Sequence, residues 1–120
     1  MDCKVRIEIT KEDNLGIVSF KDSCISDVEG IAAASRQIKK FIEENRPAKI
    51  IFDFTGVKFF SSQVLGLLLD IRAALQPYNG QVVVSAINPQ LHRVFKITNL
   101  DKIFRFYPNR DSAVKTVNAG

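Results

Sequence analysis

The chain has 120 residues, 46% of them hydrophobic and 25% charged, with six glycines and four prolines. This composition excludes a disordered or low-complexity chain, and the length allows one hydrophobic core, so we expect residues 1–120 to form a single domain. The formal net charge is only +4 and the basic residues are spread along the chain, which predicts solvated helix faces and no nucleic-acid binding.

The cysteines, the single histidine and the lack of long apolar runs narrow the class of protein further. Cys3 and Cys24 match no metal or redox spacing, and a zinc cluster would lack ligands, so we expect reduced cysteines, no metal and no cofactor. The first residues contain no apolar segment of signal-peptide length, and no apolar run reaches the roughly 18 residues of a membrane span. The sequence therefore predicts a soluble, cytoplasmic protein without direct membrane insertion.

The first half of the chain predicts two strands and a helix. Residues 3–10 alternate between apolar and charged side chains, and 15–20 follow as a second strand after a turn, so the chain should open with a hairpin. Ser26 stands three residues before Glu29, which is the spacing of a capping box, and the helix that follows should end before Pro47. The side chains expected on the buried face of this helix are Val28, Ile31, Ile38, Phe41 and Ile42.

The second half alternates buried strands with helices. Residues 50–54 and 82–84 are nearly continuous apolar runs, as expected of strands that are covered on both sides. A helix over about 63–76 separates them. Asn88 followed by Pro89 predicts the start of another helix, with Asn as the cap and Pro at the first helical position. Two further elements complete the chain, a strand around residues 103–106 and a helix over 109–117.

The resulting order, β-β-α-β-α-β-α-β-α, places the protein in the α/β class. Strands that alternate with helices imply a four- or five-stranded mixed, largely parallel sheet, with helices mainly on one face and the hairpin at one end. The two most apolar strands, 50–54 and 82–84, should lie inside the sheet, because at an edge their side chains would be exposed to water.

The sequence predicts no catalytic residues. Ser61 and Ser62 lack the flanking glycines of a hydrolase nucleophile turn, and His92 is the only imidazole that could act as a base. The glycines are isolated, so the chain has no glycine-rich phosphate loop. Asp53 ends a strand and Asp70 should lie on the outer face of a helix, so the two do not form a catalytic pair. We therefore expect that the protein is not an enzyme.

The adjacent serines at the start of the helix over 63–76 allow two interpretations. Serine is a preferred helix cap, and capping alone would explain it. Alternatively, a serine that caps the helix is also modified beside an apolar docking surface, and Ser62 would then have both roles. Leu65 and Leu69 widen the apolar stripe of this helix. If the helix carries a docking surface, they should be partly exposed, and if the serines only cap the helix, neighbouring helices should cover them. The stripe expected to face inward consists of Val64, Leu67, Leu68, Ile71 and Leu75.

Two motifs surround the turn before this helix, and others follow downstream. Residues 53–59 read DFTGVKF and residues 61–66 read SSQVLG. Downstream motifs are Asn79-Gly80, the strand over 82–84, Asn88-Pro89, Arg93-Val94-Phe95, Thr98-Asn99-Leu100 and Ile103-Phe104. Over nearly its whole length the chain thus resembles the STAS domain of the anti-sigma factor antagonists. That family has Asp-Leu-Ser/Thr-Gly-Val-x-Phe, then Asp-Ser-Ser/Thr-Gly-Leu-Gly at the start of a helix. The resemblance implies a STAS-like α/β sandwich.

The resemblance also implies a function. In that family the unphosphorylated domain binds an anti-sigma factor that is also a serine kinase, which releases a sigma factor, and a phosphatase resets the switch. It implies a bacterial, cytoplasmic phosphoprotein that regulates transcription through signalling, as a monomer or weak dimer. By position the phosphorylated residue is Ser62, with Ser61 as second choice. The implied partner-binding residues are Ser61, Ser62, Gln63, Leu65, Leu69 and Asp27, the last near the place of another acidic residue of the family.

Three positions depart from the family pattern. Ser61 replaces its Asp, Gln63 its second Ser or Thr, and Val64 its Gly. In the family the Asp shapes the phosphorylation site and the Gly lets the loop approach a partner. These departures leave three possibilities open: a divergent switch, a domain with a different kinase, or a domain that is no longer phosphorylated. Two other functions stay open: an accessory subunit that docks on a membrane transporter by the same helix face, and a small-ligand-sensing STAS domain.

Overall fold

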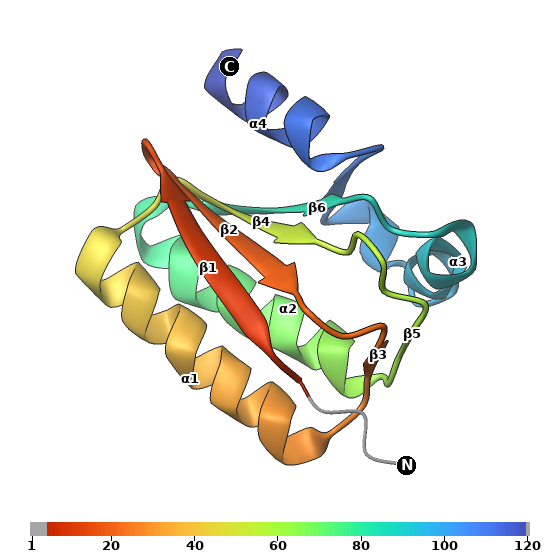
Figure 1. Ribbon diagram of the computed structural model, residues 1–120. Coiled ribbons are helices and arrows are strands. Elements are labelled where there is room, and N and C mark those ends of the chain that lie inside the picture. Colours follow the sequence, from red (N-terminus) through yellow and green to blue (C-terminus); the bar gives the residue numbers. More distant parts are fainter. Residues whose placement is uncertain (1–4, 120) are drawn as a thin grey trace.

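The computed structural model describes residues 5–119, whose main feature is a five-stranded mixed sheet (Figure 1). The strand order is β1-β2-β4-β6-β7, and β1 alone runs antiparallel to its neighbour. The strands of this sheet are β1 (Ile7–Glu12), β2 (Leu15–Phe20), β4 (Lys49–Asp53), β6 (Gln81–Ser85) and β7 (Arg105–Tyr107). The prediction of a largely parallel sheet with the two most apolar strands inside it is confirmed.

The helices occupy both faces of the sheet. The four α-helices are α1 (Val28–Asn45), α2 (Gln63–Leu75), α3 (Pro89–Ile97) and α4 (Arg110–Ala119). Helices α1 and α2 lie side by side on one face, α4 lies on the opposite face, and α3 follows the carboxyl end of β6 (Figure 1). Short elements complete the described chain: strands β3 (Cys24–Ile25) and β5 (Phe59–Phe60), and 3-10 turns η1 (Gln76–Tyr78) and η2 (Leu100–Lys102).

The interior strands are apolar without interruption because both of their faces are buried. Along β4, Ile50 and Phe52 enter the main core beneath α1 and α2, whereas Ile51 enters a smaller core beneath α4. Likewise Val82 and Val84 of β6 face the main core, and Val83 contributes to the smaller one. A strand covered on both sides loses the alternation of a half-exposed strand, so these runs indicated their position correctly.

Three expectations about the region from the hairpin to α1 are wrong. The cap of α1 is Asp27, whose Oδ2 accepts a hydrogen bond of 2.9 Å from the Gly30 N–H, and not Ser26. Val28, expected on the buried face, is 59% exposed, because it is the first residue of the helix and lies beyond the core. Cys24 is disulfide-bonded, so the expectation of reduced cysteines fails for it. Cys3 lies outside the described residues.

Candidate functional site

The serine pair lies in the short connection between β5 and α2, and backbone hydrogen bonds fix that connection. Strands β3 and β5 pair in parallel. The Ser61 N–H donates to the Ile25 carbonyl at 2.9 Å, and the N–H groups of Lys58 and Phe59 donate to the Ser23 carbonyl at 2.8 and 3.1 Å. Because β3 leads into α1 and β5 leads into α2, this pairing places the first turns of the two helices next to each other.

Ser62 occupies the cap position of α2 without acting as a cap. Its backbone is helical (φ −60°, ψ −20°), whereas a capping residue has an extended backbone that lets its side chain reach the first-turn N–H groups. Accordingly, the Ser62 hydroxyl makes no capping hydrogen bond, and the N–H of Leu65 donates instead to the Ser62 carbonyl at 3.1 Å. The expectation that this hydroxyl caps the helix is wrong. Ser62 is exposed to solvent.

Ser61 differs from Ser62 in the exposure of its hydroxyl group and in the bonding of its backbone. Its Oγ is buried and has no hydrogen-bond partner among residues 5–119, although its backbone N–H is paired. A buried hydroxyl without a partner costs roughly 1–3 kcal/mol of desolvation. It is also less accessible than the hydroxyl of Ser62.

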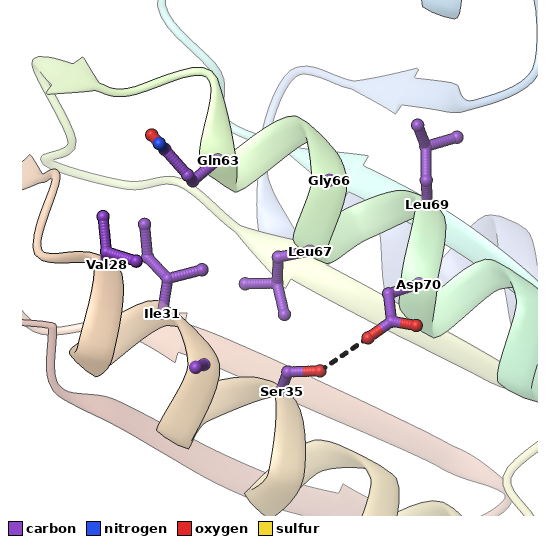
Figure 2. Close-up of a pocket in the computed structure, with 9 residues that line it drawn as sticks. Val28, Ile31, Ser35, Gln63, Gly66, Leu67, Leu69 and Asp70 are labelled. Atoms are coloured by element: carbon purple, nitrogen blue, oxygen red, sulfur yellow. Dashed lines mark hydrogen bonds between the residues drawn. The ribbon is translucent and has the colours of Figure 1, made fainter.

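A groove of about 620 Å³ lies between α1 and α2, directly beside this connection (Figure 2). Val28 stands on its α1 side and Leu69 on its α2 side, exposed by 59% and 38%. Between them, the lining is largely apolar. The remaining lining residues are Ile31, Ala32, Ser35, Gln63, Gly66, Leu67 and Asp70. Partly exposed aliphatic side chains on the rim of a groove are typical of a surface that binds another protein or an apolar ligand.

Gly66 keeps the middle of the groove open. A Cβ built on this glycine would meet no atom within 4 Å, so neither packing nor backbone conformation explains a glycine here. Glycine within a helix costs up to about 1 kcal/mol relative to alanine. The open space above Gly66 is therefore a property of the groove that the chain keeps at some cost in helix stability.

Asp70 closes one end of the groove by joining the two helices. Its Oδ2 accepts a hydrogen bond of 2.9 Å from the Ser35 hydroxyl (Figure 2). The same oxygen forms an ion pair of 2.7 Å with the Lys39 ammonium. The hydrogen bond from Lys39, followed by that from Ser35, lowers the pKa of the Asp70 carboxyl below its ordinary value. Asp70 is exposed to solvent, as the sequence predicted, and its bonds to Ser35 and Lys39 hold α2 to α1.

The structure divides the residues expected to bind a partner. Leu69 is partly exposed, as a docking role requires, and Gln63 lines the groove. Leu65 is only 7% exposed and belongs to the main core, so the expectation that it would be partly exposed is wrong. Asp27 is exposed near the groove, but its carboxylate already caps α1.

Sequence reasoning missed Val28 and Gly66 as members of the groove. Val28 was assigned to the core by its helical spacing, and only the position of the cap at Asp27 shows that it lies at the helix end. Gly66 carried a usable signal, because an isolated glycine inside a helix lowers its stability relative to alanine and so asks for another reason.

Among residues 5–119, no helix combines the length and the apolar character needed to cross a membrane. The same residues contain no cluster of three or more His, Cys, Asp or Glu side chains arranged to hold a metal ion.

The profile of the STAS domain matches residues 6–113, and the chain belongs to this family. An anti-sigma F factor antagonist of Paenibacillus polymyxa is 23% identical over 110 residues, which cover 92% of this chain and 94% of that protein.

Solved structures agree on the fold. The anti-sigma factor antagonist SpoIIAA in its unphosphorylated form has a TM-score of 0.82 at 16% identity, over 96% of this chain and 98% of that one. Its phosphorylated form from Bacillus has a TM-score of 0.72 at 18% identity, over 94% and 98% of the two chains. The murine anion transporter Slc26a9 has a TM-score of 0.64 at 16% identity over 92% of this chain, which corresponds to 19% of the transporter.

Proposed function

We propose that this STAS domain is an anti-sigma factor antagonist. It would bind an anti-sigma factor that is also a serine kinase through the groove between α1 and α2 while Ser62 is unmodified, and so release a sigma factor. In this proposal the protein is a cytoplasmic, non-enzymatic bacterial phosphoprotein, a monomer or weak dimer that a phosphatase resets. The observation that carries the proposal is the exposed, uncommitted Ser62 hydroxyl next to a groove with exposed aliphatic side chains. The names of the relatives at 23% identity or less support the same function.

The position of Ser62 explains how a phosphate could act without unfolding the domain. The first turn of a helix presents N–H groups and a partial positive charge, which stabilise an anion. A phosphate on Ser62 would therefore be tolerated by α2. It would also place between about 1.5 and 2 negative charges beside the groove. A partner that covers this surface would have to remove water from the phosphate, which is costly without compensating hydrogen bonds. Phosphorylation should thus weaken binding while the fold persists.

The phosphorylation itself is tested with the serine kinase of anti-sigma type from the same organism. The purified domain is incubated with this kinase and ATP, and phosphopeptides are mapped by mass spectrometry. We expect phosphate on Ser62 in the wild type and none in Ser62→Ala, with Ser61→Ala as the matched control that stays phosphorylated. Phosphate that maps only to Ser61, or no phosphate at any kinase concentration, would contradict the proposed switch.

The docking surface is tested separately by binding to the same kinase, measured by calorimetry. Leu69→Arg should reduce affinity at least a hundredfold, because it places a charge on the rim of the groove. Ile97→Arg is the control, since Ile97 is 74% exposed on α3 and does not line the groove. For the switch, Ser62→Asp should bind poorly, whereas Gln90→Asp adds the same charge to the first turn of α3 and should bind normally. Equal affinities for each variant and its control would overturn the docking surface.

A second candidate function uses the same groove without phosphorylation. The family's Asp and Gly are replaced by Ser61 and Val64, and the fold is also found within the transporter Slc26a9. These observations favour an accessory subunit that docks on a membrane transporter. The two candidates differ in one measurement, because a non-phosphorylated subunit would carry no phosphate on Ser62 after incubation with ATP and an extract of its own cells, whereas the antagonist would.

A further inference from the structure

A second, chemically different pocket lies at the other end of α2, away from the serine pair. It has a volume of about 200 Å³, and α2, β6 and β7 each contribute polar side chains to it. Arg72 belongs to α2 and Gln76 follows the helix directly, whereas Gln81 begins β6 and Arg105 lies on the edge strand β7. This pocket takes no part in the function proposed above, and the inference drawn from it is independent of that function.

The pocket carries positive charge that no residue in the described part of the chain neutralises. Arg72 and Arg105 both line it, and none of its lining residues is acidic. Neither arginine forms an ion pair or a side-chain hydrogen bond with any residue in the described range, whereas Arg6 is paired with Asp22 at 2.7 Å. Two guanidinium groups that face one small pocket repel each other, and a bound anion would relieve that repulsion.

Carbonyl groups at the end of α2 and just after it accept backbone hydrogen bonds. The Gly80 N–H donates to the Leu75 carbonyl at 2.9 Å, and the Asn79 N–H donates to the Gln76 carbonyl at 3.0 Å. Backbone N–H groups thus occupy the Leu75 and Gln76 carbonyls, which reduces the repulsion that a helix C-terminus exerts on an anion. The guanidinium groups therefore dominate the electrostatics of the pocket.

We propose that this pocket binds the phosphate group of a small phosphate monoester. Arginine is suited to this anion, because its planar N–H groups can donate two parallel hydrogen bonds to two phosphate oxygens. The amide groups of Gln76 and Gln81 can donate to the remaining oxygens. An adjoining pocket of about 400 Å³ shares Gln76, Gly80 and Gln81 and adds Asn79, so it is polar but uncharged. It suits the uncharged, hydroxyl-bearing part of such a monoester.

The experiment uses glycerol 3-phosphate and inorganic phosphate as probes in nitrogen-15 NMR titrations of the full chain. We expect saturable shifts centred on the side-chain amides of Gln76 and Gln81, with glycerol 3-phosphate binding more tightly than inorganic phosphate. Arg72→Ala and Arg105→Ala should each lower the affinity at least tenfold. Arg72→Lys should lie between Arg72→Ala and the wild type, because it keeps the charge and loses the two-pronged geometry.

Arg93→Ala is the matched control, since Arg93 is an exposed arginine on α3 that does not line the pocket. It should bind glycerol 3-phosphate as the wild type does, and thermal melting of each variant checks its fold. Unchanged affinity in both Arg72→Ala and Arg105→Ala would overturn the proposal. So would an equal loss in Arg93→Ala, shifts spread evenly over all basic residues, or binding to phosphatidic acid vesicles but to neither soluble probe.

Discussion

Three helices of this chain begin in different ways, because the free N–H groups of their first turns are not paired alike. At α1 and α3, an extended residue turns its side chain back on the first turn: Asp27 accepts from the Gly30 N–H and Asn88 from the Leu91 N–H, both at 2.9 Å. At α2, Ser62 has a helical backbone and its hydroxyl makes no such bond. The buried apolar side chains of α2 hold it in place without a cap. Helices α1 and α2 thus both begin beside the groove, but only α2 begins without a side-chain cap.

The cap of α3 should give the largest loss of stability among these sites. Asn88 also donates from Nδ2 to the Val57 carbonyl at 3.1 Å, so it joins α3 to the loop after β4. Asn88→Ala should lower the free energy of unfolding by about 2 kcal/mol, as measured by urea denaturation, because it removes both the cap and this bond. Asn88→Asp keeps the acceptor alone and should lose less. If both variants lose the same amount, the cap contributes little.

The cap of α1 should matter less, because Asp27 is exposed. Asp27→Ala should lower the free energy of unfolding by about 1 kcal/mol. Asp27→Asn should keep most of that stability, since asparagine caps equally well. Binding of the anti-sigma kinase then separates two roles of this residue. Weaker binding by a stable Asp27→Asn domain would show that the carboxylate contacts the partner, and unchanged binding would show that Asp27 acts only as a cap.

In the middle of α2, a substitution should raise stability. Gly66→Ala should increase the free energy of unfolding by about 0.5–1 kcal/mol, because alanine is the better helix former and its Cβ meets no atom within 4 Å. Chemical denaturation measures this gain. Gly66→Leu should fold too, but its side chain would enter the groove and reduce kinase binding. A Gly66→Leu domain that binds normally would show that the partner does not enter the groove.

At the start of α2, the loss of the hydroxyl should have the smallest effect on stability. Ser62→Ala removes no capping bond, so the free energy of unfolding should change by less than about 0.5 kcal/mol, as for other exposed sites. Denaturation beside Asp27→Ala under identical conditions checks the contrast. A loss in Ser62→Ala equal to that of a true cap would mean that the hydroxyl bonds to the first turn in solution.

The sequence predicted correctly the strands and helices that long residue patterns define. Its predictions failed for single positions, such as helix caps, where one residue's backbone conformation determines the outcome. The central strands followed from uninterrupted apolar runs, and the position of the serine pair followed from the helix after it. Ser26 and Asp27 are both good caps one residue apart, and only the extended backbone of Asp27 selects between them. Leu65 and Leu69 both lie beside the apolar stripe, yet neighbouring elements bury the first and leave the second partly exposed. Strands β3 and β5 have two residues each, too few to show a period.

The parallel pair β3–β5 has a consequence for the thermodynamics of association. A disordered loop that becomes ordered on binding loses roughly 1–2 kcal/mol of backbone entropy per residue. The bonds from Lys58, Phe59 and Ser61 to the segment before α1 already order this loop in the free domain. A partner would therefore meet a preorganised surface and would not bear that entropic cost. These three amides should exchange hydrogen slowly in the free domain, and a partner should slow them little further.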